Sequence, residues 1–510
     1  MQAVLLILTP LFPALCALLC WFVPALRPDK ARDRFVLAAL VASFLLTVAL
    51  CLTGDGSLTL FTISQNLPVV AASDGLSRLF SLLMSGMWLL SGAFSFGYMA
   101  HEGAQRRFYT FYLLTLSALL GLCFAGTLVT MYLCFELMTL LSVALVLHSL
   151  TKEAVAAGMK YLLYSIAGAM MGLLGIFFFT ANAVTPLFVP GGTLSPDAVA
   201  SQGPLLLWVL LITVIGFGTK AGLFPMHTWL PDAHSQAPSP VSALLSGVLL
   251  KCAMLVIMRF YGFTIQAVGA EYPQLLLLIV GTLSILVAAL SMFRQDDLKR
   301  RFAYSSVENV GVIALCLGIG GPLGIAAALL HCVFHGFTKT LAFCVSGNIQ
   351  HAFGTRSLAK IQGVVEVAPA TAALAVLALL GLGAFPPFGM FISEFLTFVA
   401  GVTAGPMWLV VVVALGLTVA ISALTRIALK SVFGHAPQGM GKHEAPALML
   451  IPEIILAVMI LWFGIATPLP LVHGVETATG IVLEQSTEEL HATPMYRAVF
   501  GTETAQSEVE

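Results

Sequence analysis

The stretch GTKAGLFPMHTWLPDAHSQAPSPVSALLSGVLLKC, residues 218–252, places Lys220 and Lys251 inside apolar runs on either side of a polar, proline-rich segment. The 510-residue chain around this stretch is 59% hydrophobic and only 9% charged, with a mean hydropathy of +0.99. A composition this apolar is typical of a chain that crosses a lipid bilayer many times. The two lysines are therefore expected to lie within a membrane.

Apolar runs recur along the whole chain, and each is long enough to cross the roughly 30 Å hydrocarbon layer as a helix. Because a spanning segment must satisfy its own backbone hydrogen bonds, helices are the structure expected for these runs. We predict an all-α polytopic membrane protein of about fourteen transmembrane helices, in which the segment 368–402 is interrupted in the middle. The predicted spans are 3–26, 33–52, 74–98, 107–126, 128–149, 157–180, 205–226, 237–262, 272–292, 302–319, 322–346, 368–402, 405–431 and 447–467.

Basic residues are concentrated in every second connection between the predicted spans. They are Arg27, Lys30, Arg32, Arg34, Arg106, Arg107, Lys152, Lys160, Arg294, Lys299, Arg300, Arg301, Arg356, Lys360 and Lys442. By the positive-inside rule these connections are cytoplasmic. The prediction is a multi-pass protein of the bacterial inner membrane with both termini on the periplasmic side, residues 468–510 forming an acidic, partly disordered external tail. The run 3–26 is expected to be the first span rather than a cleaved signal.

Composition also argues against several functions. A net charge of −1 is unlike that of a nucleic-acid-binding protein, and the nine cysteines include no CxxC pair. Iron–sulfur clusters, structural zinc and a disulfide framework are therefore not expected in this chain. GFGTKAG at 216–222 follows no strand, so it does not predict a nucleotide-binding loop. We expect no cofactor in this chain.

Ionisable side chains nevertheless occur inside the predicted spans. They are Glu136, Lys220, Lys251, Arg259, Glu308, His331, His335, Lys339, Glu394, Arg426 and Lys430. Each costs several kcal/mol in a bilayer, so such groups normally line a pathway or pair with one another. Arg259, Arg426 and Lys430 lie near predicted helix ends and are equally well explained by snorkelling to the interface.

Two proline-containing breaks fall at matching places in the chain. Lys220 lies just before Pro225, and Glu394 lies just after Pro386 and Pro387. Proline interrupts a helix, and broken helices near the middle of the membrane are typical of transporter repeats. Glu136 and Lys220 are 84 residues apart, and Glu308 and Glu394 are 86 apart.

This spacing predicts two inverted five-helix repeats, 107–262 and 272–431. Residues 1–106 would supply the first three helices, and 447–467 the final one.

The sequence LLHCVFHGFTKTL places three ionisable residues on one stripe of a helix. His331, His335 and Lys339 stand at i, i+4 and i+8, about 6 Å apart along the axis. Three roles are compatible with this stripe: a metal site, a hydrogen-bonded structural cluster and a proton relay. The proton relay is favoured, because histidine titrates near neutral pH and burial moves the pKa of a lysine toward neutral pH.

The polar segment after Pro225 is expected to be a rigid turn at the cytoplasmic entrance, because three more prolines follow it. In this turn Asp232 is expected to neutralise His227 or His234, and Trp229 is expected to anchor the turn at the membrane interface.

KAGLFPMHTWLPDAHSQAPSPVSALLSGVLLK and DDLKRRFAYSSVENVG (296–311) resemble the signature of the antiporter-like membrane subunits of respiratory complex I, Mrp-type cation/proton antiporters and energy-converting hydrogenases. FPPFGMFISEFLTF and HGFTKTLAFCVSGNI look most like component F of hydrogenase-4 and its formate-hydrogenlyase relatives. One position departs from the pattern, because Asn309 stands where many relatives have a histidine.

The resemblance implies a role for each matching residue. Glu136 and Lys220 would form the coupled pair of the first half-channel, and Lys251 would bridge toward the centre. The stripe formed by His331, His335 and Lys339, with Glu308 beside it, would carry the proton across, and Glu394 would pass it outward.

The resemblance also implies the function: a proton-translocating subunit of a multisubunit redox complex, of which an energy-converting hydrogenase is the favoured kind. Partner membrane subunits, including antiporter-like neighbours, would surround the chain in the lipid bilayer. Iron–sulfur clusters and a nickel–iron site, or flavin and quinone, would lie in those partners. The alternatives are a complex I (NADH-quinone oxidoreductase) subunit, a cation/proton antiporter subunit moving sodium as well as protons, and a structural membrane scaffold.

Overall fold

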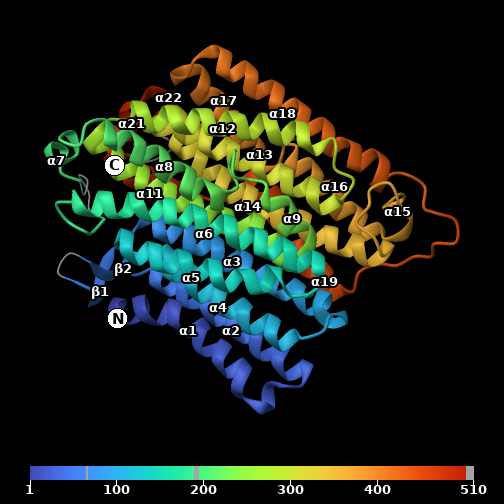
Figure 1. Ribbon diagram of the computed structural model, residues 1–510. Coiled ribbons are helices and arrows are strands. Elements are labelled where there is room, and N and C mark those ends of the chain that lie inside the picture. The colour runs from blue at the N-terminus through green and yellow to red at the C-terminus, as the bar shows by residue number, and fades with distance from the viewer. Residues whose placement is uncertain (65–66, 189–193, 501–510) are drawn as a thin grey trace, which may run out of the picture.

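The computed structural model describes residues 1–64, 67–188 and 194–500, and Figure 1 shows long helices running side by side. The helices are α1 (Gln2–Phe22), α2 (Asp29–Cys51), α3 (Gly75–Tyr98), α4 (Gln105–Cys123), α5 (Leu128–Val146), α6 (Lys152–Ala181), α7 (Pro196–Ala200), α8 (Pro204–Ala221), α9 (Trp229–Gln236), α10 (Ser239–Leu244), α11 (Leu250–Val268), α12 (Glu271–Met292), α13 (Leu298–Ile319), α14 (Gly321–Phe353), α15 (Val364–Val367), α16 (Pro369–Leu382), α17 (Gly389–Ala404), α18 (Met407–Ile427), α19 (Ala447–Ile465), α20 (Leu469–Leu483), α21 (Thr487–Ala492) and α22 (Pro494–Phe500). Single π-helical turns, Leu245–Leu249 and Ala428–Val432, precede α11 and follow α18.

Within the described ranges, 12 helices are long and apolar enough to cross a membrane. The two other predicted spans correspond to α4 and to the pair α16–α17, which is interrupted between Leu382 and Gly389. The predicted class, an all-α polytopic membrane protein, is confirmed.

The helices that carry most of the ionisable residues lie at the centre of the bundle. α14 packs against α3, α10, α13, α16, α17, α19 and α20, and it runs through the middle of Figure 1. The spans containing α11 and α14 are wholly buried, and that of α13 is almost so. Outer helices such as α1, α2 and α18 instead expose leucine, valine and tryptophan side chains. The bundle therefore encloses its ionisable side chains within an apolar core and presents an apolar exterior, as a bilayer requires.

A β-hairpin that the sequence did not predict follows α2. Its strands, β1 (Gly56–Thr62) and β2 (Pro68–Ser73), pair antiparallel. β2 is tied to the α4–α5 connection, where the Ala72 N–H donates to the Phe124 carbonyl at 2.7 Å. Hydropathy in long windows does not detect a hairpin this short, so the sequence indicates only a connection here.

The prediction of a partly disordered tail is wrong for residues 469–500, which form α20, α21 and α22. α20 packs against α3, α11 and α14. Its buried side chains include Val475, Ala478 and Val482, which recur at the spacing of one helix face. The glutamates of the same segment mask this apolar face in the sequence. Residues 501–510 lie outside the described ranges.

The basic connections meet one another through several contacts. Arg32 donates to the Gln105 side chain, Arg107 donates to the His148 carbonyl, and Arg356 donates to the Ser235 carbonyl. In Figure 1 the first residue, the hairpin and α22 lie at the left, whereas α15 lies at the right. The side of the membrane that each end faces stays a prediction.

Candidate functional site

Both predicted helix breaks are present. α8 ends at Ala221 and is followed by Gly222 in the left-handed conformation, with φ of 77°, a backbone geometry that favours glycine. Pro225 lies in the turn, and the chain resumes a helix at Trp229. The second break lies between α16 and α17 and contains Pro386 and Pro387.

The first break leaves Lys220 in the last turn of α8, with only 2% of its surface exposed. Its ammonium group donates to the hydroxyl of Tyr161 on α6 and lies 4.2 Å from the centroid of the same ring. The Ser165 hydroxyl lies 3.5 Å away. A desolvated cation over an aromatic ring gains about 2 kcal/mol. Tyr161 is therefore the principal partner of Lys220.

Close packing of α6 on α8 makes this contact possible. A Cβ atom on Gly168 would lie 2.6 Å from the Gly216 carbonyl oxygen, and one on Gly216 would meet the Gly168 carbonyl at 2.6 Å. Small residues allow two backbones in a membrane to approach this closely.

Glu136, the expected partner of Lys220, does not contact it. Glu136 lies on α5 and is half-buried, and its Oε1 atom is buried without a hydrogen bond in the described structure. Among the described residues no ion pair joins Glu136 to a lysine or arginine. The structure thus shows the lysine held by Tyr161, apart from the carboxylate.

Tyr161 links Lys220 to the second half of the broken helix. Its hydroxyl shares a hydrogen bond of 2.7 Å with Ser142 on α5, and its ring lies 4.7 Å from that of Trp229. Trp229 is buried and donates to the Thr219 carbonyl at 2.8 Å. The prediction that Trp229 is an interfacial anchor is wrong, because the turn folds inward and packs the indole across the break.

Lys251 lies on α11 directly after the π-helical turn and is wholly buried. Its ammonium group donates to the Ser246 carbonyl within that turn and to Nδ1 of His335, the latter at 2.6 Å. A π-helical turn displaces the regular hydrogen-bond ladder and often marks a functional site. Here the displaced carbonyl holds the lysine against α14.

Serine hydroxyl groups extend this contact to Lys339. The hydroxyl groups of Ser246 and Ser306 lie 2.7 Å apart, and Ser306 donates to the Phe302 carbonyl at 3.0 Å. The Lys339 ammonium donates to the same carbonyl at 2.8 Å. Lys251 and Lys339 are thus joined by a short chain of polar groups between α11, α13 and α14.

The two histidines of the predicted stripe stack on each other, with ring centroids 5.9 Å apart. Nε2 of His331 lies 3.1 Å from the Asn309 side-chain oxygen, and its Nδ1 lies 3.0 Å from the Ser393 hydroxyl. The Asn309 amide in turn donates to the Glu308 carboxylate. Asn309 therefore connects Glu308 to the stripe, although the amide itself does not titrate.

Glu394 ends this series of polar groups. It lies in the second turn of α17, beside Ser393, and is 8% exposed. Through Ser393 the second broken helix contacts His331 on α14. We name the series from Lys220 to Glu394, with Lys251, Lys339 and the two histidines between them, the central row.

The polar turn is built differently from the prediction. Asp232 accepts hydrogen bonds from Lys160 on α6, at 2.7 Å, and from Arg300 on α13. His234 is wholly buried and stacks on Phe343, with ring centroids 4.7 Å apart. Asp232 thus joins the two halves of the chain, and the prediction that it neutralises a histidine is wrong.

His227, the other candidate, is also buried. Its ring centroid lies 6.0 Å from that of Phe224 and 6.3 Å from that of Tyr304.

Of the three residues left open to snorkelling, Arg259 is paired inside the protein. Its guanidinium donates to both carboxylate oxygens of Asp74 at 2.6 and 2.8 Å, a bidentate geometry. Arg426 and Lys430 are exposed beyond the middle of α18, where snorkelling still accounts for them.

Several polar residues near the row were not predicted, namely Tyr161, Ser142, Ser246, Ser306 and Ser393. Hydroxyl groups are common in membrane helices, so single residues of this kind carry no distinctive pattern. Glu453 was also missed, although a carboxylate within the predicted span 447–467 was a detectable sign.

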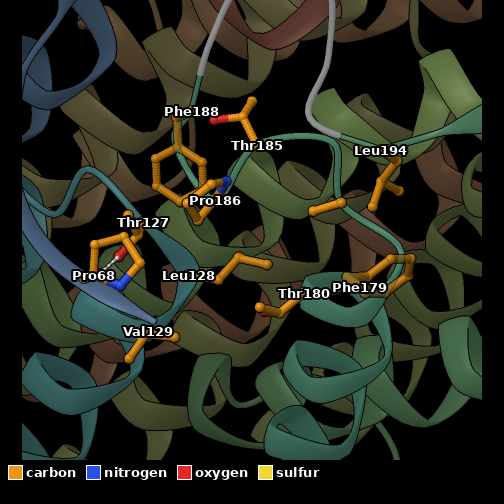
Figure 2. A pocket seen from close by; sticks show the side chains of 11 residues that line it. Pro68, Thr127, Leu128, Val129, Phe179, Thr180, Thr185, Pro186, Phe188 and Leu194 are labelled. Atoms are coloured by element: carbon orange, nitrogen blue, oxygen red, sulfur yellow. Dashed lines mark hydrogen bonds between the residues drawn. The ribbon is translucent and has the colours of Figure 1, made fainter. Parts of the chain in front are cut away.

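Figure 2 shows a pocket between β2, the start of α5 and the end of α6. Its lining residues are Pro68, Thr127, Leu128, Val129, Phe179, Thr180, Ala183, Thr185, Pro186, Phe188 and Leu194. None of these side chains titrates, so this pocket is not part of the central row.

Residues 125–420 match the transmembrane family described as NADH:quinone oxidoreductase/Mrp antiporter. This is more than half of the chain and includes the whole central row. The chain belongs to this family, and the predicted resemblance is confirmed.

Relatives and solved structures agree with this assignment. The chain is 34% identical over 381 residues to the hydrogenase-4 component F homolog of Methylacidiphilum infernorum (isolate V4), covering 72% of this chain and 79% of that protein. It is 29% identical to NADH-quinone oxidoreductase subunit N of Desulforudis audaxviator (strain MP104C), covering 77% and 82%. A chain of the membrane-bound sulfane sulfur reductase, an archaeal respiratory membrane complex, has the same fold, with a TM-score of 0.84, 22% identity and coverage of 96% and 99%.

Proposed function

We propose that this chain translocates protons as a subunit of a membrane redox complex of the hydrogenase-4 or formate-hydrogenlyase kind, in the bacterial inner membrane. The observation that carries the proposal is the central row, in which buried Lys251 of the first half of the chain donates to the buried ring of His335 in the second half at 2.6 Å. The similarity to a hydrogenase-4 component F homolog favours this kind of complex.

The first step of the mechanism is a change of partner at Lys220. While its ammonium group is held by Tyr161, Glu136 is free to take or lose a proton. When Lys220 approaches Glu136, each charge stabilises the other, and the lysine keeps its proton. Separation of the two removes this stabilisation, and Lys220 then gives up its proton, for which Lys251 is the proposed acceptor. The break after Ala221 provides the movement.

The second step is transfer along the row. Lys251 contacts His335 directly, so one proton passes from the ammonium to the ring nitrogen without a carrier. Lys339 is held beside this path, because its ammonium group and the Ser306 hydroxyl donate to the same Phe302 carbonyl. A carbonyl only accepts hydrogen bonds, so no proton is routed through this link. The proposed route continues over His331, which contacts Ser393, to Glu394 on the same helix α17, from which the proton leaves. Each group returns to its starting protonation state after one transfer.

Energy for uphill transport has to come from elsewhere in the complex. Moving one charge against 100 mV costs about 2.3 kcal/mol. We propose that partner subunits carrying iron–sulfur clusters and a nickel–iron site, or flavin and quinone, supply it through electron transfer. Other antiporter-like subunits are expected beside this chain.

Two alternative functions would use the same central row. The similarity to NADH-quinone oxidoreductase subunit N favours a complex I subunit, and the family description includes Mrp antiporters, which favours cation/proton exchange.

The test is purification of the complex from its native membrane, reconstitution into vesicles and measurement of proton uptake. If the proposal holds, the chain copurifies with nickel–iron and iron–sulfur subunits, and formate or hydrogen oxidation drives proton uptake. Uptake driven by NADH would indicate complex I, and uptake driven only by a sodium gradient would indicate an antiporter. Recovery as a stable, functional monomer would contradict the proposal.

A further inference from the structure

One buried carboxyl group has no place in the central row. Glu453 lies on α19 and is wholly buried. The Asn348 amide on α14 donates to its Oε2 atom at 2.8 Å. Oε1 of Glu453 and the Asn348 side-chain oxygen are both buried and have no hydrogen-bond partner in the described part of the chain. Two buried acceptor atoms therefore lie on adjacent side chains.

Asn348 and the central row occupy opposite faces of α14. Asn348 follows Lys339 by nine residues, which is two and a half turns of an α-helix. Lys339 points toward α13, where it contacts the Phe302 carbonyl, whereas Asn348 points toward α16 and α19, where it contacts Thr371 and Glu453. The Glu453 group is therefore separate from the route proposed above.

A hydrogen-bonded path leads from this group to the surface. The Asn348 amide lies 3.4 Å from the Thr371 hydroxyl, which donates to the Glu444 carboxylate at 2.6 Å. Glu444 is exposed in the connection between α18 and α19. The Ala370 N–H donates to the second oxygen of Glu444 at 2.7 Å, which fixes the carboxylate over the first turn of α16.

An ionised carboxylate inside a bilayer costs several kcal/mol unless a cation pairs with it. No lysine, arginine or histidine of the described residues forms an ion pair or a hydrogen bond with Glu453. A bound proton is the simplest ligand that removes the charge. A proton on Oε1 of Glu453 also turns this atom into a hydrogen-bond donor, next to the Asn348 side-chain oxygen, which has no donor in the described part of the chain.

We propose that Glu453 is a proton-binding site outside the central row, loaded and emptied from the surface at Glu444. The proton comes from bulk water to the Glu444 carboxylate, and the Thr371 hydroxyl accepts one proton and releases another. An amide does not carry protons near neutral pH, so Asn348 acts as a gate and transfer occurs when its side chain turns away. The proton leaves by the same path, and no other bond changes.

The proposed site links α19, which carries Glu453, to the helix that carries both histidines of the central row. Glu453 binds α19 to α14, the helix that carries His331, His335 and Lys339 on its other face. Occupancy of Glu453 therefore changes how firmly α14 is held, without contact with the row itself.

The test is infrared spectroscopy of the assembled complex in membranes, without electron donor, so that its outcome does not depend on transport. The wild-type protein should show a carbonyl band of a protonated carboxyl that Glu453→Gln lacks. After transfer to D2O this band should shift, and Thr371→Val should slow the shift by roughly tenfold, because one bridging hydroxyl is lost. Glu444→Gln should slow it as well.

Thr47→Val is the matched control, because Thr47 is buried and its hydroxyl bonds only within α2, to the Ser43 carbonyl at 2.9 Å. It should exchange at the wild-type rate. Identical spectra for the wild type and Glu453→Gln would overturn the proposal, since Glu453 would then carry no proton. An unchanged exchange rate in Thr371→Val would overturn the path. Conversion of the band to carboxylate on addition of sodium chloride would show that the ligand is a cation instead. The amount of assembled complex, measured in parallel, identifies any variant that fails to fold, and Asn348→Ala then replaces it, with faster exchange expected because the gate is removed.

Discussion

Lys220 has two possible partners, the neutral Tyr161 and the ionisable Glu136, and in the structure it contacts Tyr161. Tyr161 offers a hydroxyl and an aromatic face, whereas Glu136 offers a charge. Hydrogen bonds to charged groups contribute about 1.5–3 kcal/mol, and a close ion pair in a low-dielectric site is of comparable or greater strength. The two partners are thus of comparable strength, and a movement of α8 that brings Lys220 to Glu136 changes which partner holds the lysine.

Replacing Lys220 with methionine should abolish coupled proton uptake in vesicles while the amount of assembled complex and its electron-transfer activity stay near wild type. Replacing it with arginine should also abolish uptake, because arginine stays protonated and hands no proton on. If the arginine variant pumped normally, titration of Lys220 would not be the switch.

Tyr161→Phe keeps the ring over Lys220 and removes only the hydroxyl. The separated state then loses one charged hydrogen bond, so Lys220 spends more time near Glu136 and proton uptake should fall by roughly tenfold. Tyr272→Phe is the control, because that hydroxyl donates to the Leu207 carbonyl at 3.1 Å, away from the row. Uptake at the wild-type rate in Tyr161→Phe would show that the hydroxyl does not set the balance.

At the scale of elements, the two broken helices and α14 have different roles: the breaks allow movement, and α14 keeps its side chains in place. A continuous helix satisfies its backbone and resists bending, whereas a break leaves a hinge and lets a mid-membrane side chain change partner. α14 is continuous over 33 residues, so it keeps His331, His335 and Lys339 at fixed spacing. The Lys160–Asp232–Arg300 contacts join α6, α9 and α13, which couples the first break to the second half of the chain.

The connection after α18 is fixed to α15 by a carboxylate. The Ala436 N–H and the His435 ring hold the Glu366 carboxylate at 2.9 and 3.1 Å, and they lower the pKa of Glu366 below its ordinary value of 4.5, the N–H contributing most. A lowered pKa in the folded state contributes stability above the ordinary value, and this stability is lost as the pH falls through the folded value.

A spin label on Gly441→Cys, in the same connection and with open space around it, should therefore become more mobile as the pH falls below about 4.5. In Glu366→Gln this transition should be absent, because the group no longer titrates. The same transition in the variant would assign it to another residue.

For the whole molecule, the outer faces of α1, α2, α6 and α18 expose large apolar side chains. In a bilayer these faces contact lipid or neighbouring subunits. Glu136 lies among exposed Leu133, Leu137 and Leu140 on α5, so a partner is expected on that face.

The predicted orientation is tested with reporters fused to the chain. A reporter after Glu510 should be active outside the cytoplasm, and one inserted at 294–301 should be active inside, because the positive-inside rule keeps basic connections cytoplasmic. The reverse pattern would overturn the orientation and with it the side from which Glu453 is loaded.

The sequence by itself determined the membrane class, most of the spans, both breaks and the buried charges, because hydropathy and proline act locally along the chain. The family was also recognisable, since its motifs are contiguous. Only the tertiary structure decided which groups meet: Lys220 with Tyr161, Asp232 with Lys160 and Arg300, Asp74 with Arg259, and Glu453 with Asn348. Each of these pairs joins helices distant in sequence, and their contact depends on how each helix is rotated about its axis, which spacing within one helix does not encode.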